Sequence, residues 1–128
     1  MPKLDLIGIV VKDMPASLAF YRLLGMDIPA EMDSEGHVEV VLDGGLRVAW
    51  DTLEIVMSIS DHWTEPAGHR MGLAFLCDSP AEVDRVYAEV LAAGYGSIKE
   101  PWDAFWGQRY AQVSDPDGNS VDLFAPLE

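Results

Sequence analysis

Side chains that could perform acid–base or metal chemistry are sparse in this sequence. The candidates are the carboxylates of Asp122, Asp51 and Glu39 and the imidazoles of His37, His62 and His69. Such groups bind divalent cations or act as general bases. The histidines do not stand at H-x-H, H-x3-H or H-E-x-x-H spacing, so no chelating pair is predicted. A lone carboxylate more often orients a ligand or accepts a structural hydrogen bond than acts as a base, and no catalytic residue is assigned.

A second candidate for function is an aromatic stretch in the C-terminal half. Trp102, Phe105 and Trp106 lie within five residues that show no regular periodicity. Loops seldom carry that much apolar area without burying it, so we expect these rings to face either a ligand or the partner chain of a homodimer. Plugging the junction between two halves of the chain is the alternative. Trp50 and Asp51 are further candidates for the same ligand site.

Composition limits the classes of function. The chain has 128 residues, of which 49% are hydrophobic and 23% charged, so we expect one globular domain over 1–128. No apolar run is long enough to cross a bilayer, so we expect no membrane segment. A net charge of -14 disfavours nucleic acid and anionic membranes as partners. Solubility is the preferred interpretation of this charge, and steering of cationic ligands is the alternative. Cys77 is the only cysteine and is expected to be buried and inert. With no secretory pattern at the N-terminus, a cytoplasmic location is expected.

The first half of the chain predicts a β-α-β-β-β order. An apolar run, 4–11, reads as a buried strand, and a helix is expected from Met14 to a stop at Gly25. Residues 26–58 are expected to form an antiparallel meander, with a tight hairpin at 43–45. Module one is therefore 1–59, and residues 60–70, which contain Pro and Gly, form a linker.

The second half, module two at 71–128, repeats this order. A strand is expected at 71–77, then a helix that Ser79 caps and Gly94 ends. After the aromatic loop, strands at 109–113 and 120–124 pair across the turn 115–119. We therefore predict an α+β fold of two β-α-β-β-β modules with pseudo-two-fold symmetry, whose curved mixed sheets surround a cleft and whose helices lie outside. A ferredoxin-like sandwich is the alternative.

The pattern resembles the vicinal oxygen chelate superfamily, which includes glyoxalase I, bleomycin-resistance proteins and extradiol dioxygenases. The resemblance covers essentially the whole chain. It is carried by Ile9-Val10-Val11-Lys12-Asp13, Ser17-Leu18-Ala19-Phe20-Tyr21 and Leu24-Gly25 in module one, and by Leu73-Ala74-Phe75, Asp78, Ala93-Gly94 and Asp115-Pro116-Asp117-Gly118-Asn119 in module two. Together these motifs are specific, and the resemblance implies a homodimer with paired ligand sites.

Metal-dependent members of that superfamily carry a ligand on the first and last strand of each module. The corresponding positions here are Leu6, Gly72, Ala49 (or Val48, one residue earlier) and Asp122. Only Asp122 can donate an oxygen, and one carboxylate holds a divalent ion weakly. We therefore predict no metal and no other cofactor. The alternative is a divalent metal held by a displaced set around Asp122, Asp51 and a histidine.

Three functions follow. The preferred one is a metal-independent homodimer, similar to the bleomycin-resistance branch, which binds a small aromatic, antibiotic-like molecule that can carry a positive charge. Its predicted ligand-binding residues are Trp102, Phe105, Trp106, Asp122, Trp50 and Asp51. The alternative is a metal-dependent lyase, isomerase or dioxygenase built around Asp122. The third is a structural or regulatory subunit without a small ligand, since one fold hosts several functions.

Overall fold

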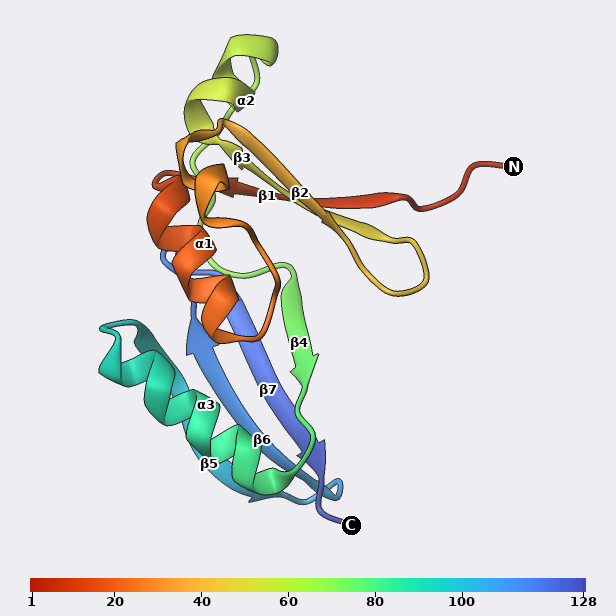
Figure 1. Ribbon diagram of the computed structural model, residues 1–128, viewed down its shortest axis with the longest axis vertical. Helices are drawn as coiled ribbons and strands as arrows, with labels where there is room; N and C mark the ends of the chain where they lie inside the picture. Colours follow the sequence, from red (N-terminus) through yellow and green to blue (C-terminus); the bar gives the residue numbers. More distant parts are fainter. The chain divides into compact units, whose positions relative to one another are not determined.

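The computed structural model describes residues 1–128, and the contacts within it divide the chain into two units. Unit one comprises residues 1–22 and 26–66, and unit two comprises residues 23–25 and 67–128. Each unit contains one mixed sheet (Figure 1). None of the helices combines the length and apolar character that a bilayer-spanning segment needs.

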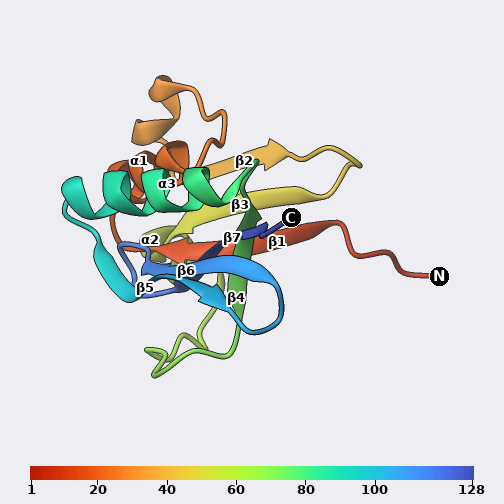
Figure 2. The ribbon, with the colours of Figure 1, turned by 90° about the horizontal axis from the view of Figure 1, so that it is seen from below.

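Unit one is built on a three-stranded sheet. Its elements are β1 (Leu6–Val11), α1 (Met14–Leu23), the 3-10 helix η1 (Ala30–Ser34), β2 (His37–Val41), β3 (Arg47–Thr52) and α2 (Leu53–Ile59). β3 lies between β1, to which it is parallel, and β2, to which it is antiparallel (Figure 2). The predicted first strand, first helix and hairpin at 43–45 are confirmed, with Gly44 and Gly45 at positive φ in the turn.

The meander predicted for residues 26–58 is wrong at both ends. Residues 30–34 form a 3-10 turn after Pro29 instead of a strand, and residues 53–59 form α2. The side chain of Thr52 accepts a hydrogen bond from the backbone N–H of Ile55, which starts this helix. Gly36 makes the packing possible, because a Cβ there would lie 2.7 Å from the Ile55 side chain.

Unit two has the predicted β-α-β-β-β order. Its elements are β4 (Gly72–Leu76), α3 (Pro80–Ala92), β5 (Gly96–Ala104), β6 (Gln108–Ser114) and β7 (Ser120–Pro126). The sheet order is β4-β7-β6-β5, with β4 parallel to β7 and the other pairs antiparallel. The Ser79 hydroxyl accepts from the N–H of Glu82, as predicted, and Pro80 occupies the first turn of α3.

Helix α3 covers one face of the unit-two sheet (Figure 1). Valines on the helix and alternate residues of the two central strands are buried, as alternation along a strand requires. They are Val83, Val86, Val90, Ala111, Val113, Val121 and Leu123. Arg109 lies on the same face and pairs with Asp84 of α3. The alternate residues of β6 and β7 therefore point to the face away from the helix.

The turn between β6 and β7 is closed by a buried carboxylate. Asp115 is only 4% exposed and accepts three hydrogen bonds, from the backbone N–H groups of Asp117 and Asn119 and from Nδ2 of Asn119, at 2.8–2.9 Å. Gly118 supplies the positive φ that this turn needs. The predicted closing hairpin is confirmed, with Ser114 opposite Ser120.

We expect Asp115→Ala to lower the free energy of unfolding by about 2–3 kcal/mol, because it leaves several turn donors without their acceptor. Urea denaturation followed by tryptophan fluorescence measures this loss. Asp43→Ala, in the exposed β2–β3 hairpin, is the control and should change stability by less than about 0.5 kcal/mol. Equal losses in the two variants would contradict the role given to Asp115.

Candidate ligand site

Asp122 is held by two neutral donors from the neighbouring strand. Its carboxylate accepts a short hydrogen bond from the Tyr110 hydroxyl and another, at 2.9 Å, from Nε2 of Gln112. The pairing of β6 with β7 places Gln112 directly opposite Asp122 and Tyr110 opposite Phe124. Burial and the Asp122 carboxylate raise the pKa of Tyr110 to about 12, so its hydroxyl remains a donor at neutral pH. The result is a fixed, partly buried anion on the face away from α3.

Aromatic rings continue this site along the sheet. Trp102 of β5 lies opposite Tyr110, and Trp106 contacts both rings edge to face, with centroid distances of 5.5 Å to Trp102 and 5.3 Å to Tyr110. Phe105 packs on Trp106 at 4.9 Å and is 90% exposed at the β5–β6 turn. Flat aromatic ligands stack on such rings.

The aromatic stretch is positioned differently from the prediction. Trp102 belongs to strand β5, which runs to Ala104, and only residues 105–107 form the turn. Two register shifts in the β5–β6 pairing, between Ser97 and Trp102, explain why the sequence shows no regular alternation here. The aromatic loop is thus a bulged strand end and a tight turn.

The β4 edge of this face is small and apolar. Gly72, Ala74 and Leu76 pair with Ser120, Asp122 and Phe124 respectively. The side chain of Leu76 is 67% exposed, and Ala74 next to Asp122 is exposed. The β4 residues beside the Asp122 carboxylate therefore supply apolar contacts and no atom that could bind a metal ion.

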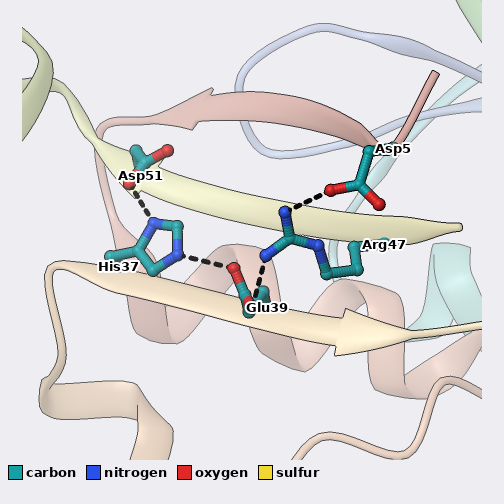
Figure 3. A network of polar contacts seen from close by, with 5 residues as sticks. All are labelled: Asp5, His37, Glu39, Arg47 and Asp51. Carbon is teal, nitrogen blue, oxygen red and sulfur yellow. Dashed lines mark hydrogen bonds and ion pairs between the residues drawn. The ribbon is translucent and has the colours of Figure 1, made fainter. Parts of the chain in front are cut away.

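Unit one carries a separate charged network on its sheet (Figure 3). His37 of β2 contacts Asp51 of β3 through Nδ1 at 2.5 Å and Glu39 through Nε2 at 3.0 Å. Arg47 then bridges Glu39 at 2.9 Å and Asp5 at 2.6 Å. When His37 is protonated, negative and positive side chains alternate along this network. The protonated imidazole carries a positive charge and donates a hydrogen bond from each nitrogen.

The network changes the pKa values of its members. Hydrogen bonds to Asp51 and then to Glu39 raise the pKa of His37 above its ordinary value of 6.5. His37 and then Arg47 lower the pKa of Glu39. The two carboxylates lie at opposite nitrogens of the imidazole, so they do not form one ligand set around a single cation.

Trp50, which was predicted for the ligand site, and Cys77, which was predicted to be buried and inert, both lie in the packed interior. Trp50 is fully buried on β3 and its ring contacts Tyr21 of α1 at 5.5 Å. Asp51 follows it and therefore points to the opposite face, toward His37. Cys77 is buried, and burial raises the pKa of its thiol, as expected of an inert cysteine.

Most positions at which the resemblance to the vicinal oxygen chelate superfamily implies a metal ligand carry no donor atom. Leu6, Ala49 and Gly72 offer no donor atom, so Asp122 is the only one of these residues that could bind a cation. No group of three or more His, Cys, Asp or Glu side chains is arranged to hold a metal ion. The residues present do not fit a chelated divalent cation.

Three site residues were missed in the sequence: Tyr110, Gln112 and Lys99. The ammonium of Lys99 lies 4.8 Å from the ring centroid of Trp102. Tyr110 and Gln112 could have been found, because the predicted hairpin between 109–113 and 120–124 fixes which residues lie opposite Asp122. Lys99 could not, because the two register shifts in β5 hide its pairing.

Comparison with known proteins places these observations in a family. A model described as Glyoxalase/Bleomycin resistance protein/Dioxygenase superfamily matches residues 3–123. No curated protein matches the chain. Several solved structures do, and they confirm the predicted fold class.

Three of these structures illustrate the similarity. A glyoxalase/bleomycin resistance protein/dioxygenase family enzyme from Burkholderia phytofirmans PsJN has 23% identity and a TM-score of 0.81, with 98% of this chain and 100% of that chain covered. A protein of the same description from Nocardioides has 26% identity and a TM-score of 0.72, covering 100% and 85%. Lactoylglutathione lyase from Agrobacterium tumefaciens has 22% identity and a TM-score of 0.66, covering 96% and 92%.

The His37 network makes stability depend on pH. Because the folded-state pKa of His37 is raised, its contribution to stability is complete below about pH 6 and is lost as pH rises through the folded pKa. We expect the stability difference between the wild type and His37→Gln to shrink between pH 6 and pH 9, measured by urea denaturation. His62→Gln, in the loop after α2, is the control. An NMR titration midpoint for His37 at or below 6.5 would contradict this account.

Proposed function

Because this chain belongs to the Glyoxalase/Bleomycin resistance protein/Dioxygenase superfamily, we propose that it binds a small aromatic molecule, without a metal ion, on the unit-two sheet around Asp122. The observation that carries the proposal is the Asp122 carboxylate, held by Tyr110 and Gln112 beside a row of aromatic rings. A fixed anion next to ring faces suits an organic ligand with a cationic or hydrogen-bond-donating group.

The chemistry around Asp122 supports binding over metal-dependent turnover. A chelated metal ion needs two or three further donor atoms beside the carboxylate, whereas the neighbours of Asp122 are Tyr110, Gln112 and the methyl group of Ala74. Tyr110 and Gln112 would hold the carboxylate in place for a ligand, which lowers the ordering cost of binding. We therefore propose sequestration of an antibiotic-like compound as the role, with no catalytic residue.

The exposed turn supports a wider contact surface. Phe105 and Trp106 are 90% and 47% exposed, and they extend the ring row beyond the sheet. Stacking on such rings contributes on the order of 1 kcal/mol each beyond the apolar area they bury. These rings are proposed to close over the ligand or to contact a second copy of the chain in a homodimer.

We expect EDTA-treated protein to bind proflavine, a planar cationic dye, in isothermal titration calorimetry. Asp122→Asn should weaken that binding about tenfold, since it removes the anionic partner and keeps the shape of the side chain. Trp106→Ala should weaken it by removing a stacking surface.

Asp43→Asn changes the net charge equally at a distant hairpin and is the matched control, expected to leave the dissociation constant within about twofold. Equal weakening by Asp43→Asn would show that proflavine responds only to the overall charge of the protein. Heat of binding that appears only after zinc or manganese is added would also count against the proposal.

A further inference from the structure

Two opposite charges on the unit-two sheet lack a charged partner. Asp122 is contacted by the hydroxyl of Tyr110 and the amide of Gln112, which are both neutral. The ammonium of Lys99 lies over the ring of Trp102 rather than beside a carboxylate. Arg109, by contrast, is paired with Asp84 and Asp103 toward the α3 face. Ion pairing within unit two therefore leaves Lys99 and Asp122 available.

The strand register places these two charges in one row across the sheet. Lys99 pairs with Gln112, and Gln112 pairs with Asp122 on the next strand. Two strand spacings separate the Cα atoms of Lys99 and Asp122 by about 10 Å. Gln112 lies between them, and its side-chain N–H already donates a hydrogen bond to Asp122. The row thus presents a cation at one end and an anion at the other.

The adjacent row of the same sheet is aromatic. Trp102 pairs with Tyr110, and Tyr110 pairs with Phe124, whose ring centroid lies 6.4 Å from that of Tyr110. Leu76 extends this row onto β4. The indole Nε1 of Trp102 is buried without a hydrogen-bond acceptor. A flat ring lying along this row would direct its two ends toward opposite charges.

We propose that the ligand is an aromatic zwitterion, with a cationic amine that pairs with Asp122 and a carboxylate that pairs with Lys99. This inference rests on the proposed function and adds the acidic group to it. A ligand with only a cation satisfies Asp122 and leaves Lys99 unpaired, whereas an anionic ligand meets repulsion from Asp122. The separation of the two Cα atoms, about 10 Å, leaves room between the side chains for a benzene-sized ring with a charged group at each end.

Three probes of the same shape test the proposal. 4-(Aminomethyl)benzoate carries both charges, 4-(aminomethyl)benzamide carries only the cation, and 4-methylbenzoate carries only the anion. Dissociation constants come from 1H–15N NMR titrations of the full chain, which also locate the shifted residues. We expect the zwitterion to bind about fivefold tighter than the amide, the upper range for one exposed ion pair, and the anion to bind weakest.

Variants assign the acidic group to its partner. Lys99→Met keeps a long apolar side chain against Trp102 and should bring the zwitterion down to the affinity of the amide, while the amide binds as before. Lys3→Met makes the same charge change in the N-terminal segment and should leave all three affinities unchanged.

The outcomes separate the two proposals. Equal binding of zwitterion and amide, or a loss in Lys99→Met that is the same for both probes, would overturn the zwitterion proposal and leave the proposed function standing. Failure of all three probes to shift residues of β6 and β7 would overturn both.

Discussion

The buried carboxylate of Asp115 is the constraint on which the candidate site depends. By accepting three hydrogen bonds within the turn, it sets Ser114 opposite Ser120 and thereby fixes the β6–β7 register. Two residues further along, Gln112 then faces Asp122. A slip of one residue would move Asp122 to the face that α3 covers, because side chains alternate along a strand. The buried carboxylate of Asp115 therefore determines the position of the Asp122 carboxylate.

The two units share a pairing pattern and differ in what it carries. In each, a central strand is parallel to the first strand and antiparallel to its other neighbour. Ala49, paired with Gly8 and Glu39, occupies the place that Asp122 holds between Ala74 and Gln112. The same ladder thus presents a carboxylate in unit two and a methyl group in unit one.

The balance of charge also differs between the two sheets. In unit one, His37, Arg47 and their carboxylates pair with one another in an alternating chain, so the charges are satisfied within the protein. In unit two, the Asp122 carboxylate and the Lys99 ammonium on the face away from α3 do not pair with each other, and the amide of Gln112 lies between their strands. Charges that are already paired gain little from a ligand, whereas unpaired ones gain more. This contrast is why the ligand is assigned to the unit-two sheet.

Much of the fold was predictable because its signals are local. Gly and Asp at the hairpins, the Ser79 cap and the apolar first strands each specify structure within a few residues. Helix α2 was not, because its apolar sequence fits a strand equally well and only the Thr52 cap marks its start.

The site was only partly predictable. Asp122 and the rings of Trp102 and Trp106 were predicted as ligand residues from their residue types, and that role stays a prediction; their neighbours depend on cross-strand register. Trp50 shows the limit of reasoning from residue type, since its place on β3 turns it into the core beside Tyr21. The cleft predicted between the modules, the ligand and the homodimer stay predictions.

We propose that Asp122 serves an organic ligand and holds no metal ion. Elemental analysis of untagged protein, followed by calorimetric titration with manganese, nickel and zinc, tests it most directly. We expect no stoichiometric metal and no saturable heat with any of the three ions. One equivalent bound at micromolar affinity or tighter, and lost in Asp122→Ala, would contradict it.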